Sequence, residues 1–248
     1  MLRLCLLRTG ADCHHLIYTS HHILMDGWSN SRLLGEVLQT YAGQAVAAPE
    51  GRYQDYLAWL QRQDKADSQR FWQGQLAPLE EPTRLALACA RGADAEPGQA
   101  LHSVRLSSEQ TRRLQAFARQ QQVTLNTLVQ SAWLLLLQRY TGQRSVAFGA
   151  TVSGRPVELV GIEQQLGLFI NSLAVVATPD GALTVAQWAQ AVQAQNLALR
   201  DHEHMPLAEV QRLAGRNGEA LFDTLLVFEN YPVSEALQAA PGLSLIHI

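Results

Sequence analysis

Short apolar runs separated by polar residues open the chain and predict two strands that form a hairpin. The runs cover residues 2–8 and 13–20, and the Gly-Ala-Asp segment at residues 10–12 between them is typical of a turn. Apolar residues then recur at helical spacing over residues 28–41, and Gly43 ends this predicted helix. The beginning of the chain therefore predicts a hairpin, a loop and a helix.

The rest of the chain mixes both periodicities without strict alternation, which indicates an α/β fold. Ser107 and Gln110 form an expected capping box at the start of a helix. The helix over residues 126–140 is apolar nearly all round, so we expect it to be buried. The Pro-, Gly- and Ala-rich residues 79–98 are expected to connect two lobes. The other predicted elements are helices that begin at residue 53 and cover residues 69–76 and 185–200, and strands over residues 101–106, 145–152, 168–177 and 221–229.

Composition and charge exclude several classes of protein. Of the 248 residues 47% are apolar, which is ample for a core and argues against a disordered chain. The formal net charge of -3 gives no broad attraction for nucleic acid or an anionic membrane. Three cysteines are too few for a disulfide framework or a closed zinc site, and we predict that Cys5 and Cys13 are reduced core thiols. The N-terminal run resembles neither a membrane span nor a signal peptide, so we expect a cytoplasmic protein.

A polar cluster after the second strand is the first candidate for chemistry. His21 and His22 leave the strand, and Asp26 and Gly27 follow them. An imidazole has a pKa of about 6.5, so it can take up or release a proton at neutral pH. Adjacent side chains on a strand point to opposite sides, so the two histidines are not expected to share one role. The same divergence disfavours a metal site, and the alternative is that both histidines are structural.

Four segments in order carry a resemblance to one family. Residues 21–29, HHILMDGWS, resemble the HHxxxDGWS signature of the condensation domains of nonribosomal peptide synthetases. Residues 53–59, YQDYLAW, are similar to the YxDYAxW motif of that family, and residues 167–172, GLFINS, are similar to its GxFVNT motif. Residues 202–207, HEHMPL, are less closely similar to its HQDYPFE motif. Their order along the chain is the family order, which makes a chance resemblance very improbable.

The resemblance implies an α/β fold of two lobes, a pseudo-dimer of chloramphenicol-acetyltransferase-like halves with mixed sheets flanked by helices. Residues 1–90 would be the C-terminal part of the N-lobe with the HHxxxDG loop, and residues 91–242 would be most of the C-lobe. In the family the signature lies well inside the first lobe, whereas here it begins at residue 21. We therefore expect a fragment that is truncated at both ends. We also expect a bacterial source. Residues 243–248, LSLIHI, match the translation of a transposase adapter used in sequencing libraries, and we hypothesise that they are not natural protein.

The resemblance also implies an activity and roles for five residues. The reaction would be the formation of an amide bond between two carrier-bound groups in secondary metabolite biosynthesis. By motif position His22 is the catalytic residue, which acts as general base on the acceptor amine or orients it. Gly27 would place a backbone N–H near the developing oxyanion. Asp26 is expected to hold the loop with Arg155 as its partner, and His21 is expected to pack beneath it.

Four more residues are predicted to contact substrate. The residues are Trp28, Ser29, Asn171 and Ser172. For Asn171 and Ser172, interior packing is an equally weighted alternative. Substrates would arrive on the 4′-phosphopantetheine arms of donor and acceptor peptidyl carrier proteins, beside an adenylation domain of the same synthetase. We expect no directly bound cofactor or metal, and no nucleic acid or membrane partner.

Other activities remain as alternatives at this point. An epimerization domain shares the fold and the histidine signature, but its relatives more often read DGVSW where this chain has Trp28. A free-standing acyl-CoA acyltransferase would not need the later motifs. A non-catalytic module that docks carrier proteins is a third alternative, and the intact signature argues against it. Heterocyclization domains replace the histidine pair with aspartates. Residues 71–85 look like the class of condensation domain that accepts a donor with a D-configured terminal residue.

Overall fold

The computed structural model describes residues 1–88, 98–216 and 219–229. Contacts between Cα atoms divide the chain into two compact units, which are described separately. The chain passes between them after Gln63, Val152, Ile170 and Phe228, so that unit 1 includes a segment from the middle of the sequence. Among the described residues, unit 1 takes in Met1–Gln63, Ser153–Ile170 and Glu229, and unit 2 lies within Asp64–Val152 and Asn171–Phe228. The predicted boundary between two lobes at residue 90 stays a prediction.

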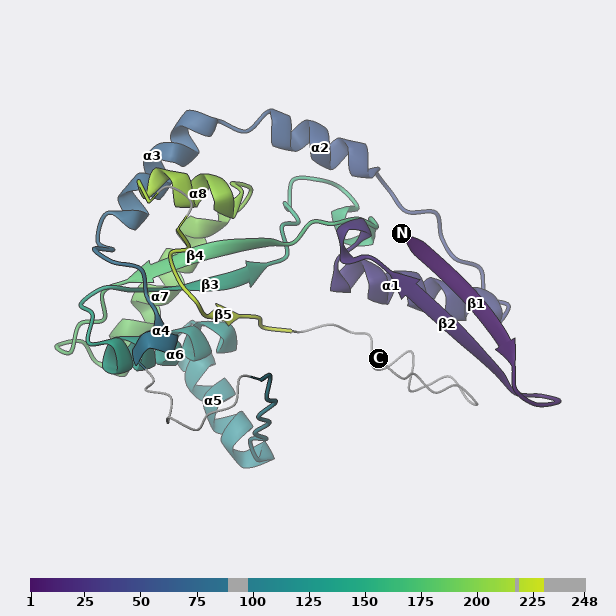
Figure 1. Cartoon of the computed structure of the whole chain (residues 1–248), viewed down its shortest axis with the longest axis horizontal. Coiled ribbons are helices and arrows are strands. Elements are labelled where there is room, and N and C mark those ends of the chain that lie inside the picture. The colour runs from purple at the N-terminus through teal and green to yellow at the C-terminus, as the bar shows by residue number, and fades with distance from the viewer. Residues whose placement is uncertain (89–97, 217–218, 230–248) are drawn as a thin grey trace. The chain divides into compact units, whose positions relative to one another are not determined.

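Unit 1 begins with the predicted hairpin (Figure 1). Strand β1 (Leu2–Arg8) pairs antiparallel with β2 (His14–Ser20), in a register that places Leu4 opposite Tyr18. The turn between them is held by the Arg8 guanidinium, which donates to the carbonyls of Gly10 and Ala11. The remaining elements of unit 1 are the 3-10 helix η1 (His22–Leu24), α1 (Gly27–Tyr41), α2 (Tyr53–Gln61) and the 3-10 helix η2 (Ile162–Gln164).

The cysteines of the hairpin are not core residues. Cys5 and Cys13 are free thiols, as predicted, but both are exposed. Every residue of β1 is exposed, so its alternating side chains meet solvent on both faces of the two-stranded sheet. Apolar neighbours along a strand bury a residue only where another layer covers that face. The prediction of core thiols was therefore wrong.

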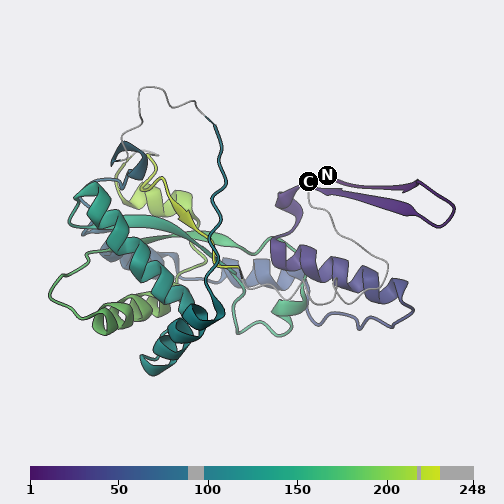
Figure 2. The ribbon, with the colours of Figure 1, turned by 90° about the horizontal axis from the view of Figure 1, so that it is seen from below.

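Unit 2 is built around a three-stranded sheet in the order β4-β3-β5. Strand β3 (Val146–Val152) pairs antiparallel with β4 (Asn171–Ala177) and parallel with the short β5 (Leu225–Leu226). Helices cover both faces of this sheet, with α7 and α8 on opposite faces (Figures 1 and 2). These helices are α3 (Lys65–Leu76), α4 (Leu85–Ala88), α5 (Ser108–Gln120), α6 (Leu125–Thr141), α7 (Val185–Arg200) and α8 (Leu207–Leu213).

The core of unit 2 joins the sheet to helices from both faces. Its fully buried side chains include Trp72, Leu134, Phe148, Val192 and Val210. The predicted capping box of α5 is confirmed, because Ser107 and Gln110 each accept from the backbone N–H of the other residue. Helix α7 has the bounds predicted for it, residues 185–200. Helix α3 begins at Lys65, four residues before its predicted start, and α4 and α8 were not predicted.

Four predictions for unit 2 were wrong. Residues 101–106 form no strand, because this segment pairs with none of the described residues and its side chains are exposed. The last strand is only the two residues of β5, and β4 begins at Asn171 instead of residue 168. Helix α6 is buried on one side only, because Leu135 and Leu136 are 44% and 46% exposed. An apolar sequence gives the potential for burial, and the packed neighbours decide it.

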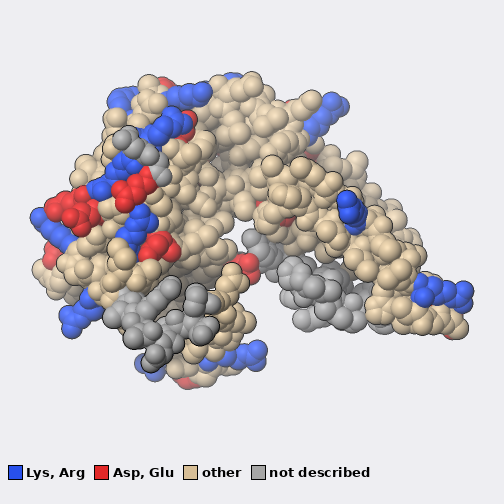
Figure 3. All heavy atoms as spheres, in the orientation of Figure 1, with Lys and Arg blue, Asp and Glu red and all other residues tan. Residues whose placement is uncertain are grey.

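The predicted linker and the predicted adapter lie partly or wholly outside the described residues. Residues 79–88 are described and contain α4, whereas residues 89–97 and the tail 243–248 are not. No helix among the described residues is long and apolar enough to cross a membrane. Acidic and basic side chains lie intermixed on the face of unit 2 shown in Figure 3.

Candidate functional site

The two histidines of the signature lie at the entrance to α1, and they are used differently. His21 caps η1, where its Nδ1 accepts from the backbone N–H of Ile23 at 3.1 Å. Its side chain is exposed, so the expectation that it packs beneath the loop was wrong. His22 is the first residue of η1; it is exposed and has no hydrogen-bond partner among the described residues. The imidazole of His22 is exposed and has no side-chain hydrogen bond to the described residues, so a reacting group can reach it.

Asp26 fixes the end of this loop with a buried carboxylate. It is 1% exposed and forms the N-cap of α1, where Oδ1 accepts from the Ser29 backbone N–H at 2.8 Å. Its Oδ2 accepts from the Phe169 backbone N–H at 3.0 Å, and its own N–H donates to the carbonyl of Gly167. Aspartate at an N-cap satisfies helix donors that have no partner inside the helix. Asp26 therefore joins the His22 loop to residues 167–169.

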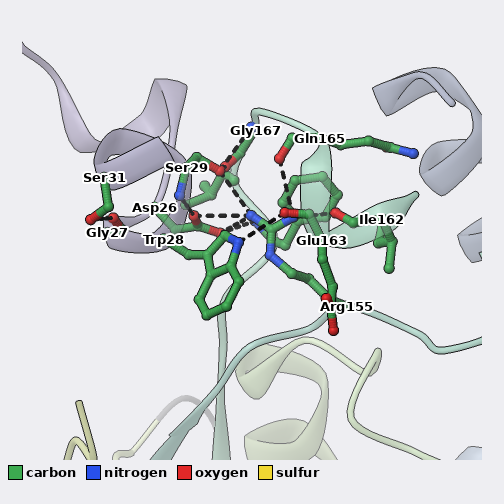
Figure 4. A network of polar contacts seen from close by, with 12 residues as sticks. Asp26, Gly27, Trp28, Ser29, Ser31, Arg155, Ile162, Glu163, Gln165 and Gly167 are labelled. Atoms are coloured by element: carbon green, nitrogen blue, oxygen red, sulfur yellow. Dashed lines mark hydrogen bonds and ion pairs between the residues drawn. The ribbon is translucent and has the colours of Figure 1, made fainter. Parts of the chain in front are cut away.

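Arg155 completes the network from the segment that returns to unit 1 (Figure 4). One guanidinium nitrogen, Nη2, lies 3.2 and 3.4 Å from the two Asp26 oxygens and 2.8 Å from the Ser29 hydroxyl. The other, Nη1, donates to the carbonyls of Ile162 and Gln165. The Arg155 side chain is 5% exposed, so this is a buried ion pair, in the pairing that the sequence analysis expected.

Burial changes the electrostatics of two groups around Asp26. Burial lowers the pKa of Arg155, and the adjacent Asp26 carboxylate opposes that shift. An arginine keeps its positive charge in proteins, so the pair stays ionic at neutral pH. Burial also raises the pKa of Tyr53, and the negative charge of Asp26 adds to this effect. The neutral phenol donates to the carbonyl of Leu168 at 2.9 Å.

Aromatic residues of the second motif pack against the same segment. The ring of Phe169 lies edge-on to Tyr53 and Tyr56 of α2, with centroid distances of 5.1 and 4.9 Å. The guanidinium carbon of Arg155 lies 3.9 Å from the centroid of the Phe169 ring. Cation–π and aromatic contacts of this kind stabilise a buried arginine. Residues 53–59 therefore support the site, and Phe169 is a residue of this network that sequence reasoning did not single out.

Ser29 and Trp28 contribute to the network through hydrogen bonds to the backbone. The Ser29 hydroxyl donates to the Gly167 carbonyl at 2.8 Å and accepts from the Gly167 N–H at 3.1 Å. Ser29 is fully buried, so it holds the loop in place of the predicted contact with substrate. The Trp28 indole donates to the carbonyl of Glu163 at 2.9 Å and is half-buried. Substrate contact by Trp28 stays a prediction.

Gly27 is the first residue of α1, directly after the Asp26 cap. The backbone N–H groups of the first turn of a helix have no carbonyl partner inside the helix. The positive end of the helix dipole also favours negative charge at this position. The Gly27 N–H is one of these groups, and its role in holding an oxyanion stays a prediction.

Gly154 lets the Arg155 segment approach Phe169. Its φ is +60°, and a Cβ built on it would lie 1.8 Å from the Phe169 carbonyl oxygen. We expect Gly154→Ala to lower the free energy of unfolding by about 3 kcal/mol, because it adds a left-handed backbone penalty to a backbone clash. The matched control is Gly181→Ala, where a Cβ meets no atom within 4 Å. Urea denaturation that shows equal stability for both variants would contradict this close approach.

Asn171 and Ser172 belong to unit 2 and not to the unit that holds the signature loop. Asn171 Nδ2 donates to the carbonyls of Glu203 and Met205, each at 2.8 Å. Its Oδ1 accepts from the backbone N–H of Ser172. The Asn171 Nδ2 group therefore donates its hydrogen bonds within the protein and not to substrate. This agrees with the alternative of interior packing. Contact between Ser172 and substrate stays a prediction.

The HEHMPL segment forms a second histidine cluster in unit 2. Ser68 Oγ of α3 lies 3.2 Å from Nδ1 of His202 and 3.1 Å from Nε2 of His204. The His202 ring stacks on Phe71 at a centroid distance of 4.0 Å, and the Trp72 indole donates to the His202 carbonyl. Local sequence gave no sign of these contacts, because Ser68 is 134 residues away from His202. No group of three or more potential metal ligands occurs in the described parts of the chain.

The second cluster makes stability depend on pH. Burial lowers the pKa of His204, and the neighbouring His202 adds to this effect. In the unfolded chain His204 takes up a proton near pH 6.5. In the folded chain the same imidazole takes up its proton only at a lower pH. We therefore expect the free energy of unfolding to fall as the pH drops from 7 through the lowered pKa of His204. Urea denaturation between pH 8 and pH 5 measures this slope.

His204→Gln is expected to flatten that slope, because it removes the titrating group. His102→Gln is the matched control, since His102 is exposed and lies outside the cluster. A slope that persists in His204→Gln and disappears in His102→Gln would contradict the assignment.

Comparison with known proteins identifies the class. The Condensation domain family model matches residues 1–247, so the chain belongs to the condensation domain family. The likeness to solved condensation domains confirms the predicted α/β, chloramphenicol-acetyltransferase-like fold. The first condensation domain of the calcium-dependent antibiotic synthetase, in complex with a substrate analogue, superposes with a TM-score of 0.69 at 23% identity, over 94% of this chain and 54% of that one. The four-domain nonribosomal peptide synthetase AB3403 superposes with a TM-score of 0.72 at 23% identity. The match covers 92% of this chain and 18% of that one.

Curated relatives are much longer synthetases. Chondramide synthase cmdD of Chondromyces crocatus is 41% identical over 99% of this chain and 6% of its own length. A linear gramicidin synthase polypeptide of Brevibacillus parabrevis is 39% identical over 96% of this chain and 3% of its own length. The chain therefore spans less than a tenth of the length of these relatives.

Proposed function

We propose that this chain forms part of a condensation domain that joins an aminoacyl or peptidyl thioester donor to an aminoacyl acceptor. The observation that carries the proposal is the exposed His22 on a loop whose next turn is fixed by the buried Asp26–Arg155 ion pair. Membership of the family supports amide formation as the reaction. The relatives are synthetases of nonribosomal peptides, which supports carrier-bound substrates.

The acceptor amine supplies the nucleophile. Its pKa is about 8, so roughly a tenth of the amine is already neutral at pH 7. His22 orients this amine by accepting a hydrogen bond from it, and takes up its proton as the C–N bond forms. The donor carbonyl becomes a tetrahedral oxyanion, which the Gly27 N–H faces at the start of α1. The C–S bond then breaks, and the proton passes to the departing phosphopantetheine thiolate.

Asp26 takes no part in proton transfer in this proposal. Its two oxygens already accept from Ser29, Phe169 and Arg155 within a buried site. The Asp26 carboxylate has a structural role, because it holds the His22 loop against residues 167–169. Asp26 and Arg155 are therefore positioning residues, and His22 is the residue that touches the reacting amine.

The expected partners follow from this reaction. Donor and acceptor carrier proteins deliver the substrates on 4′-phosphopantetheine arms, and the domain binds no cofactor of its own. An adenylation domain of the same synthetase loads the carriers in the cytoplasm. We place the chain in the class that takes a D-configured donor and an L-configured acceptor, on the likeness of residues 71–85 to that class. Donors of both configurations, offered in competition, test this subclass.

The function is tested with a synthetase that carries this chain in a complete condensation domain. Both carrier proteins are loaded with aminoacyl groups, and the products on each carrier are analysed by mass spectrometry. The proposal predicts a dipeptide on the acceptor carrier. Inversion of the α-carbon without a dipeptide would assign an epimerization domain instead. Two unchanged thioesters would assign a module that only docks carriers.

A further inference from the structure

The turn that carries His22 is short and lies at the surface of unit 1. It is the single 3-10 turn η1 (His22–Leu24), and none of its residues is buried. A 3-10 turn of this length has poor hydrogen-bond geometry of its own, and here no packed core adds to its stability. Its conformation therefore depends on the hydrogen bonds that hold its two ends.

Both ends of this turn are tied to other parts of unit 1. Before the turn, the His21 backbone N–H donates to the carbonyl of Met1 at 3.0 Å. After the turn, Asp26 lies in the buried ion pair with Arg155. Only residues 22–25 lie between these two anchors. The conformation of this short segment therefore decides where the His22 imidazole lies.

His21 supplies the hydrogen-bond acceptors at the start of the turn. Its Nδ1 accepts from the Ile23 backbone N–H at 3.1 Å, and its carbonyl accepts from the Leu24 N–H at 3.0 Å. Its backbone is extended, with φ of -81° and ψ of 133°, as is usual for an N-cap. Asparagine is one of the usual residues at such a position. An imidazole can replace it here, because Nδ1 is attached to Cγ in the same way as Oδ1 of asparagine.

The cap also sets the tautomer of His21. A ring nitrogen that accepts a hydrogen bond carries no proton, so the neutral imidazole of His21 holds its proton on Nε2. The lone pair of Nδ1 is then used by the turn. His22 has no hydrogen-bond partner among the described residues, so its ring nitrogens are not used in this way. The two adjacent histidines therefore differ in what their lone pairs do.

We propose that His21 is a positioning residue, whose Nδ1 lone pair holds the turn that presents the His22 imidazole to the acceptor amine. Every contact in this assignment lies within unit 1. The catalytic meaning of the cap rests on the proposed role of His22. The cap itself has a spectroscopic signature that needs no turnover, so its failure is distinguishable from a failure of the proposed function.

Nitrogen NMR of the full 248-residue chain tests the cap. The shifts of the two ring nitrogens of a histidine distinguish the nitrogen that carries a proton from the one that does not. Above the pH range in which histidine titrates, we expect His21 to show an unprotonated Nδ1 and a protonated Nε2. His15 is the matched control, because it is exposed on β2 and its ring forms no hydrogen bond to the described residues. We expect its shifts to be an average over both tautomers.

Variants of His21 test the positioning role. His21→Ala removes the acceptor, and in a complete condensation domain we expect dipeptide formation to slow about tenfold, because the His22 turn loses its cap. His21→Asn keeps an acceptor on Cγ for the Ile23 N–H, as in an Asx turn, and we expect at least about half of the wild-type rate. His15→Ala is the control and is expected to keep the wild-type rate. In the 248-residue chain, we expect the backbone chemical shifts of residues 22–24 to change in His21→Ala and to be kept in His21→Asn.

Three results would overturn the inference. In the first, His21 carries a proton on Nδ1, or exchanges between tautomers as His15 does. In the second, His21→Ala keeps the wild-type rate, or loses rate while the shifts of residues 22–24 stay the same. In the third, His21→Asn is as slow as His21→Ala, so that the imidazole contributes something other than an acceptor. If the wild type itself forms no dipeptide, the proposed function fails, and the chemical shifts still decide whether His21 holds the turn.

Discussion

Arg155→Ala is expected to lower the free energy of unfolding by about 3–5 kcal/mol, the cost of leaving a buried charge without its partner. The guanidinium contacts Asp26 and Ser29 and two backbone carbonyls, and the Arg155 side chain is only 5% exposed. Without it, the Asp26 carboxylate keeps its bonds to the N–H groups of Ser29 and Phe169 but has no positive charge nearby within the described network. Urea denaturation of the wild type and the variant measures the loss.

Two further variants make this test specific. Arg144→Ala is the matched control, because Arg144 is exposed and its side chain forms no ion pair among the described residues. Arg155→Lys keeps the charge but cannot reproduce the planar fork, so we expect it to recover only part of the stability. A loss of less than about 1 kcal/mol in Arg155→Ala, the size typical of a surface pair, would contradict a buried structural role.

The family resemblance implied the central contact of the site, with Asp26 holding the loop and Arg155 as its partner. The role of Asp26 as the N-cap of α1 was not predicted and comes from the structure. The structure brings these two side chains together although 129 residues separate them. The start of α5 was predicted from its capping chemistry at Ser107, whereas the Thr184 cap of α7 was found only in the structure.

Burial was harder to predict than secondary structure. Cys5 and Leu135 have apolar neighbours in the sequence, yet both are exposed, because a face is buried only where another element packs on it. Ser29 shows the reverse error: this small polar residue of the signature motif is fully buried and hydrogen-bonded. Ser68 carried no local signal at all, since its two histidine partners are 134 and 136 residues away.

His22→Ala is expected to reduce the rate of peptide formation by at least about 100-fold, the contribution typical of a positioned acid–base group. His22 is exposed and makes no hydrogen bond to the described residues, so its removal leaves the Asp26–Arg155 network intact. We therefore expect unfolding free energies of wild type and variant to agree closely. This combination separates a catalytic residue from a structural one, because a structural residue would lower stability and rate together.

The most direct test is dipeptide formation with loaded donor and acceptor carrier proteins, in a synthetase that carries this chain in a complete condensation domain. His14→Ala is the matched control, because His14 is an exposed histidine on β2, outside the signature loop. The proposed function predicts that His14→Ala forms the dipeptide at the wild-type rate and that His22→Ala forms almost none. A wild-type rate in His22→Ala would contradict it.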